Sequence, residues 1–184
     1  MKIALAYNEE DSQLIKKLET DLNPSGYSFV HFDFSKSKPE YLLYEALADY
    51  QWPILLFVSD RFLKSATSMT GMLQFFQKKE DQIYPILLPS EEGDMSTIPD
   101  IERVGGIIKY INYWQEHYLD LRKQKRELQL ADEDSFNAHL KRIREISTEV
   151  GEFLRQLRAS TYCNINEFKA EDYEIFLEFL DDTT

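Results

Sequence analysis

Apolar residues recur along the first 110 residues in two alternating patterns. Short, almost unbroken apolar runs predict buried β-strands, and the longer segments between them repeat apolar residues every three or four positions, as amphipathic helices do. Strands separated by helices of this length are joined by right-handed crossovers, which predicts a parallel sheet with helices on both of its faces. The predicted strands cover residues 2–7, 27–34, 52–59 and 82–89.

The segments between and after these strands differ in how clearly they predict a helix. Segment 9–22 repeats leucines at four-residue spacing, which predicts an amphipathic helix. A single helix is expected from about Asp60 to Lys79, after the third strand. The segment 106–111 either supplies a fifth strand or leads directly into a helix, and both alternatives stay open.

Beyond residue 110 the sequence becomes helical and rich in charge. Segments 110–128 and 132–160 predict two long helices that form an antiparallel hairpin, joined near residues 129–134. Apolar residues of the second helix recur on one side, which is expected to be its buried face. They are Phe136, Leu140, Ile143, Val150, Phe153 and Leu157.

No internal repeat or low-complexity linker divides the chain. We therefore expect one domain, 1–184, in which an α/β core over 1–110 carries a helical extension over 111–184. A final helix is predicted over 170–182, with a buried face made of Tyr173, Phe176, Leu177 and Leu180.

Charge and cysteine content narrow the classes of partner. With a net charge of −12 and an isoelectric point near 4.7, the chain lacks the basic surface that nucleic acids and anionic membranes require, so neither is expected as a partner. The apolar runs are far shorter than a bilayer span. Cys163 is the single cysteine, which excludes an intrachain disulfide and a thiolate zinc cluster, and no metal site is expected. The N-terminal apolar run is too short for a secretory signal, so we expect a cytoplasmic protein.

Candidate binding residues lie where the predicted strands end. Ligands of open parallel sheets bind outside the carboxyl ends of the strands. The three histidines occur in different predicted elements, so no catalytic triad is expected, and both tryptophans are expected in the core or under the extension. The candidates at the carboxyl edge are Tyr7, Asn8, Asp33, Ser59 and Arg61.

Several segments resemble one protein family. "IALAYNEEDSQLIKKLETDL" (3–22) is similar to the opening of a TIR (Toll/interleukin-1 receptor) domain, and "LLFVSDRFLKSATSMTGMLQFF" (55–76) is similar to its third strand and following helix. "YPILLP" resembles the family's fourth strand, and "YINYWQEHYLDL" with the helices after it resembles the extension of bacterial TIR proteins. The resemblance implies a flavodoxin-like parallel sheet of four or five strands flanked by helices, with a C-terminal helical extension.

Many TIR domains also cleave NAD, with a glutamate on the helix after the third strand. Aligned on the family pattern, Ser68 stands where a cysteine is common and Gly71 where the glutamate would be, so no catalytic residue is assigned. A positioned acid or base contributes roughly 10²–10⁴-fold to a rate, so its loss implies little or no glycohydrolase activity. If the rest of the pocket is intact, Gly71→Glu is expected to raise NAD cleavage. The resemblance adds Ser68 and Gly71 to the nucleotide-pocket candidates, and Lys36, Lys38 and Glu40 as candidates for an interaction loop.

Three functions stay open. The first is a TIR-like signalling module that assembles with itself or with another TIR-containing protein, with NAD at most a ligand. The second is a NAD glycohydrolase of the prokaryotic immunity type, whose acid comes from elsewhere in the chain or from a neighbouring copy on oligomerisation. The third, ranked last, is a receiver-like phosphoacceptor, which is loosely suggested by Glu10, Asp11, Asp60 and Lys109.

Overall fold

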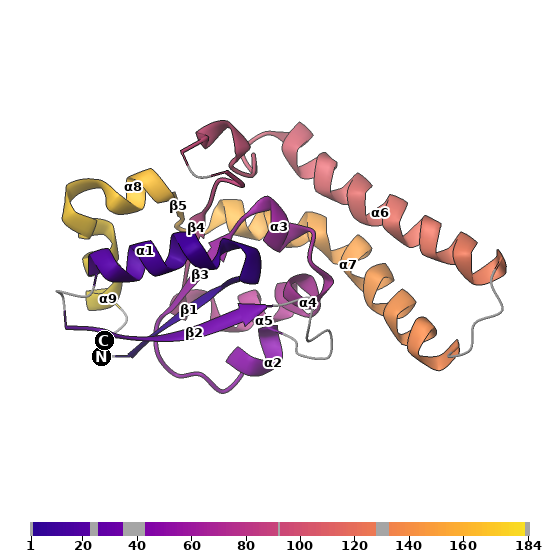
Figure 1. Ribbon diagram of the computed structural model, residues 1–184, viewed down its shortest axis with the longest axis horizontal. Helices are drawn as coiled ribbons and strands as arrows, with labels where there is room; N and C mark the ends of the chain where they lie inside the picture. The colour runs from indigo at the N-terminus through magenta and orange to yellow at the C-terminus, as the bar shows by residue number, and fades with distance from the viewer. Residues whose placement is uncertain (1, 23–25, 35–42, 92, 128–132, 183–184) are drawn as a thin grey trace.

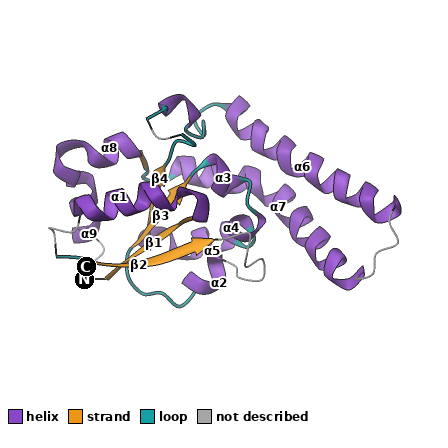
Figure 2. Cartoon of the chain, viewed as in Figure 1, coloured by secondary structure: helices purple, strands orange, loops and turns teal. Residues whose placement is uncertain are grey.

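Five parallel strands form one sheet in the order β2-β1-β3-β4-β5 (Figures 1 and 2). The computed structural model describes residues 2–22, 26–34, 43–91, 93–127 and 133–182. This sheet, flanked by helices and followed by a C-terminal helical region, is consistent with a flavodoxin-like fold and confirms the predicted fold class. The strands are β1 Lys2–Asn8, β2 Ser28–Phe34, β3 Ile54–Val58, β4 Ile83–Leu87 and β5 Cys163–Asn164.

Helices make up most of the described chain, and two of them are much longer than the others. Within the described ranges, none combines the length and the apolar composition that crossing a membrane requires. Short 3₁₀ turns occupy Glu9–Asp11, Glu80–Gln82, Met95–Thr97 and Ala170–Tyr173. The α-helices are α1 Ser12–Leu22, α2 Leu43–Leu47, α3 Asp60–Leu63, α4 Ala66–Met69, α5 Met72–Lys79, α6 Val104–Glu127, α7 Glu133–Ala159, α8 Ile165–Lys169 and α9 Glu174–Asp182.

Different sets of helices cover the two faces of the sheet. Successive side chains of a strand point to opposite faces. Ile3 and Leu5 of β1 therefore pack with α1, α8 and α9, whereas Ala4 and Ala6 pack on the side of α2 to α7. The central strands β1 and β3 are buried along nearly their whole length. This double burial explains why these strands read as unbroken apolar runs.

The long helices α6 and α7 pack against each other as an antiparallel hairpin, as predicted, and its far end projects beyond the sheet (Figure 1). Trp114 of α6 is buried, and its Nε1 donates to the carbonyl oxygen of Leu63 at 2.9 Å. Phe153 of α7 packs edge-on against Phe76 of α5, with ring centroids 5.8 Å apart. Buried aromatic contacts thus join the hairpin to the α/β core. The predicted link at 129–134 lies mostly outside the described residues.

The prediction of a single helix over 60–79 is wrong, because three short helices occupy this segment. Ser59 and Ser65 cap α3 and α4, each accepting a hydrogen bond from a backbone N–H of the helix that it precedes. Thr70 is extended, and Gly71 has a φ of +68°, a left-handed conformation that glycine adopts readily. The chain therefore turns twice within a segment whose apolar periodicity reads as continuous.

Four further features of the structure settle or correct the sequence-based expectations. Segment 106–111 lies inside α6, so the alternative of a direct lead into a helix is correct. The fifth strand instead consists of the two residues Cys163–Asn164, too short to show a period. Trp52 is 48% exposed just before β3, and Leu177 is 43% exposed on α9, so both were wrongly expected to be buried.

Candidate functional site

The strand order changes direction between β1 and β3, and the residues that follow these two strands meet at the carboxyl edge of the sheet. Ser59 directly follows β3, and its hydroxyl donates to Oδ2 of Asp11 at 2.5 Å. The same Ser59 oxygen accepts from the backbone N–H of Phe62 at 3.1 Å, which fixes the start of α3. Ser59 and Asp11 are both buried. They fill the point at which sheets of this topology bind ligands.

One guanidinium ties three loops of this edge together. Arg61 donates from Nη1 to Oδ1 of Asp11 at 3.0 Å and from Nη2 to the carbonyl oxygen of Ser90 at 2.8 Å. Its Nε lies 3.3 Å from Oε2 of Glu10. The loops after β1, β3 and β4 are therefore held in one hydrogen-bonded group, which we call the Asp11–Ser59–Arg61 cluster.

The pKa of the Asp11 carboxyl group depends mainly on its burial. Removal from water disfavours the charged carboxylate and raises the pKa of Asp11, while the hydrogen bonds from Ser59 and Arg61 oppose this rise without cancelling it. Each carboxylate oxygen of Asp11 is already used by a donor of the chain itself. Asp11 is therefore placed to hold the loops together rather than to exchange a proton with a ligand.

Tyr7 and Asn8 end β1 beside this cluster, and both side chains have partners within the chain. The Tyr7 hydroxyl lies 2.9 Å from Nδ1 of His31. The Asn8 side chain accepts a hydrogen bond from the backbone N–H of Glu10 at 3.1 Å. Burial, together with the nearby charge of Asp33, raises the pKa of Tyr7 to about 12, so the phenol stays neutral. Asp33, in register with Tyr7 on β2, is exposed and thus accessible to a ligand.

The two positions added by the family resemblance lie on α4 and immediately before α5. Ser68 is fully buried, and its hydroxyl has no hydrogen-bond partner among the described residues. At Gly71, a Cβ would lie 2.7 Å from Cδ1 of the Tyr44 ring, closer than real Cβ atoms approach a neighbour. Gly71→Glu would have to strain the backbone and displace Tyr44. Both effects oppose the gain in NAD cleavage that the sequence led us to expect.

The interaction-loop candidates Lys36, Lys38 and Glu40 lie outside the described residues. Within the described part of the chain, no group of three or more His, Cys, Asp or Glu side chains could hold a metal ion.

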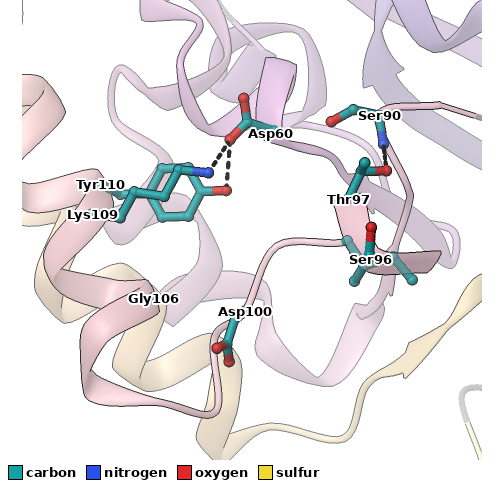
Figure 3. A pocket seen from close by; sticks show the side chains of 9 residues that line it. Asp60, Ser90, Ser96, Thr97, Asp100, Gly106, Lys109 and Tyr110 are labelled. Atoms are coloured by element: carbon teal, nitrogen blue, oxygen red, sulfur yellow. Dashed lines mark hydrogen bonds and ion pairs between the residues drawn. The ribbon is translucent and has the colours of Figure 1, made fainter. Parts of the chain in front are cut away.

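Asp60, the first residue of α3, lines a cavity of about 400 Å³ that also borders the loop after β4 and the start of α6 (Figure 3). Its Oδ1 accepts hydrogen bonds from Nζ of Lys109 and from the Tyr110 hydroxyl, each at 3.0 Å. Its Oδ2 lies 2.7 Å from Nζ of Lys64. The sequence-based grouping of Asp60 with Lys109 is therefore confirmed as a contact, although Lys109 comes from a helix and not from a strand end.

The environment of Asp60 differs from that of a phosphoacceptor. Burial alone would raise the pKa of Asp60, but its three donors outweigh burial and hold the pKa below its ordinary value. Glu10 and Asp11, which a receiver-like site would place beside Asp60, bind Arg61 instead. Asp60 is thus an ionised carboxylate whose charge is balanced by Lys64 and Lys109, and it joins α3 to α6.

A second cavity, of about 820 Å³, adjoins the first along the segment 95–103. Thr97 anchors this segment, because its Oγ1 accepts from the backbone N–H of Ser90 at 2.9 Å. At the far side, the Tyr162 hydroxyl donates to the carboxylate of Glu102. The sequence predicted only a loop here and gave no indication of a cavity. The Ser, Thr and Asp residues of the loop, which favour local turns, were the only signal of an ordered structure.

The hairpin brings two histidines together that the sequence treated as isolated. The rings of His117 on α6 and His139 on α7 have centroids 6.4 Å apart in an edge-to-face arrangement. Tyr113 stacks on His117 with a centroid distance of 6.2 Å. Burial lowers the pKa of His139, and electrostatic repulsion from His117 and Arg142 lowers it further.

Comparison with known proteins adds no identification. No protein-family model matches the chain, and no curated protein matches its sequence. The resemblance to TIR domains therefore rests on the residues themselves, above all those of segments 3–22 and 55–76. The flavodoxin-like fold is a finding, whereas membership of the TIR family is a prediction.

Proposed function

We propose that the chain is a TIR-like interaction module, which assembles with copies of itself or with another TIR-containing protein and does not cleave NAD efficiently. The observation that carries this proposal is the contact of Gly71 with Tyr44. The family resemblance puts the catalytic glutamate at this position. Here the left-handed backbone and the neighbouring ring both oppose any side chain.

The carboxylates at the carboxyl edge support the same function. A general acid or base must reach its substrate directly or through one water molecule. Asp11 is buried and bonded to Ser59 and Arg61, and the oxygens of Asp60 accept from two lysines and a tyrosine. Both carboxylates therefore stabilise the loops that they connect and are poorly placed for proton transfer.

A NAD glycohydrolase is the second candidate function. The observation that favours it is the position of Asp33, an exposed carboxylate at the end of β2 that is in register with Tyr7 of β1. If this chain supplies its own acid, Asp33 is the described residue best placed to do so. If a neighbouring copy supplies the acid, NAD cleavage should depend on protein concentration.

Nicotinamide release from NAD by the purified wild-type chain tests the proposal. The reaction is followed by chromatography at dilute and at high, crowded protein concentration, with Asp33→Asn as the matched variant. We expect no release above the protein-free blank in any sample. Release at both concentrations that disappears in Asp33→Asn would establish a glycohydrolase. Release from crowded samples alone would show that the acid is supplied in an assembly.

The proposal includes a protein partner and a cytoplasmic location. The net charge of −12 supports a partner other than nucleic acid or an anionic membrane surface. The single cysteine, Cys163, is buried and free, so the chain has no intrachain disulfide. This supports the proposed cytoplasmic location, because disulfides are rare in the reducing cytoplasm.

A further inference from the structure

Another cavity, of about 740 Å³, lies at the edge of the sheet opposite to the candidate site. Ile83 and Tyr84, the first two residues of β4, form part of its lining, so it lies at the amino edge. The end of α7 and one side of α9 line the rest. We call it the amino-edge cavity, after its lining by residues of 80–84, 159–161 and 175–179. Its volume falls within the range of roughly 300–1,000 Å³ that is usual for small-molecule sites.

Aromatic and aliphatic side chains form one part of this lining. The rings of Tyr84 on β4 and Phe179 on α9 contact each other with centroids 5.1 Å apart. Ile83 and Ile175 add aliphatic side chains. The face of an aromatic ring attracts cations, because the ring quadrupole places negative charge there. This part of the lining can therefore pack against an apolar chain and also attract a positively charged group.

Carboxylates occur on two of the elements that line the cavity. Glu80 and Asp81 belong to the turn before β4, and Glu178 belongs to α9. All three are exposed, and within the described part of the chain none of their side chains forms an ion pair or a hydrogen bond. No lysine, arginine or histidine is among the described residues of the lining. The cavity is therefore negatively charged, and no basic residue of its lining balances this charge.

The carboxylates of the cavity are not arranged around one point. Across the residues that the structure describes, no three acidic, histidine or cysteine side chains could together hold a metal ion. A single inorganic cation such as Mg²⁺ or Ca²⁺ needs several oxygen ligands around it, so it does not fit this arrangement. A linear polyamine fits better, because its ammonium groups are spaced along an apolar chain.

We propose that the amino-edge cavity binds a linear polyamine. One ammonium group pairs with Glu178 on α9, and another pairs with Glu80 or Asp81 on the turn before β4. The methylene chain between them packs over the rings of Tyr84 and Phe179. This inference goes beyond the proposed function, since the cavity lies at the other edge of the sheet and no residue of the Asp11–Ser59–Arg61 cluster lines it.

Isothermal titration calorimetry of the full chain with spermidine, at low ionic strength, measures the binding. Glu178→Gln removes a charge at an exposed position, and Phe179→Leu removes the ring but keeps an apolar side chain. We expect each to weaken spermidine binding by at least about fivefold. Glu116→Gln removes the same charge from an exposed position on α6, outside the cavity, and should leave binding unchanged. Circular dichroism checks that each variant is folded.

Comparison ligands test the chemistry of the site. Putrescine carries an ammonium group at each end of an apolar chain, whereas Mg²⁺ has the same charge without the chain. N-acetyl-lysine amide presents a single ammonium group, as a side chain of another protein would. We expect Mg²⁺ and the lysine amide to bind at least about tenfold more weakly than putrescine. Equal binding of Mg²⁺ would show only a general attraction to an acidic protein, and equal binding of the lysine amide would indicate a protein partner. Either result would overturn the polyamine site.

NMR of the backbone amides locates the ligand without any substitution. Spermidine should shift the signals of residues 80–84 and 175–179. The proposal is wrong if millimolar spermidine does not bind, if the shifts occur elsewhere, or if Glu116→Gln weakens binding as much as Glu178→Gln does. None of these results changes nicotinamide release from NAD, so the proposed function is tested separately.

Discussion

Gly71 lies against the aromatic ring of Tyr44, so that a Cβ at position 71 would be 2.7 Å from Cδ1 and 2.9 Å from Cε1 of that ring. The backbone of Gly71 has a φ of +68°, which already disfavours a side chain. The contact joins the segment before α5 to α2, and it occupies the position at which the family resemblance implies a catalytic glutamate.

Replacement of Gly71 should therefore destabilise the fold for two separable reasons. We expect Gly71→Ala to lower the free energy of unfolding by about 2–3 kcal/mol, of which about 1–2 kcal/mol comes from the left-handed backbone and the rest from crowding against Tyr44. Gly26→Ala is the matched control, because Gly26 has a φ of +76° but no atom lies within 4 Å of the position that a methyl carbon would take there. Urea denaturation measures both. Equal losses at the two positions would show that the Tyr44 ring yields freely.

Loss of the Asp11 carboxylate should open the Asp11–Ser59–Arg61 cluster. Asp11→Ala removes the carboxylate to which the Ser59 hydroxyl and Nη1 of Arg61 donate, and we expect the free energy of unfolding to fall by about 3 kcal/mol. Asp11→Asn keeps an acceptor and should lose less. Glu127→Ala, which removes one partner of an exposed ion pair on α6, should change stability by less than about 0.5 kcal/mol. The prediction fails if Asp11→Ala is as stable as the Glu127→Ala control in chemical denaturation.

The contribution of Asp60 should depend on pH. The folded pKa of Asp60 lies below its ordinary value of 3.8, so the ionised carboxylate stabilises the fold above that pH, and this contribution is lost as the pH falls through the folded pKa. At neutral pH, Asp60→Asn should lower the free energy of unfolding by about 1–3 kcal/mol, because its bonds to charged donors are weakened. Denaturation of both proteins from neutral pH down to about pH 3 should show this gap closing. A gap that stays constant with pH would contradict the assignment.

His139 of the hairpin should titrate in a characteristic direction. Because burial, His117 and Arg142 lower the pKa of His139, its ring should gain a proton only below the ordinary value of 6.5. The unfolded chain binds this proton first, so stability is full above pH 6.5 and decreases as the pH falls toward the folded pKa. Ring-proton NMR measures the titration, with His139→Gln to assign the signals. A midpoint at or above 6.5 would be evidence against this account.

Much of the fold was readable from the sequence, because burial follows a local period within each element. The unbroken apolar runs of β1 and β3 predicted central strands, and these strands are buried on both faces. The apolar spacing of α7 predicted its buried side, and Ile143, Val150 and Phe153 are buried there. Predicting these features takes only a short stretch of sequence, a few helical turns or a few strand residues, because the periodicity is local and does not depend on distant contacts.

The candidate site was predictable in its location but not in its bonding. Parallel strands end at one edge of a sheet, so the sequence placed Tyr7 and Ser59 at that edge. It did not show that Ser59 donates to Asp11, or that Asp60 accepts from Tyr110 as well as Lys109. The broken helix before α5 was missed for a related reason, since the φ of Gly71 leaves the apolar period unchanged.

The sequence by itself determined the alternation of strands and helices, the burial of each face and the long C-terminal hairpin. Only the tertiary structure decided the contacts of Asp11 with Ser59, of Gly71 with Tyr44 and of His117 with His139. The physical reason is that amphipathic periodicity is a property of neighbouring residues, whereas these contacts join segments far apart in the chain. They depend on strand order and on close packing between elements, which no local pattern records.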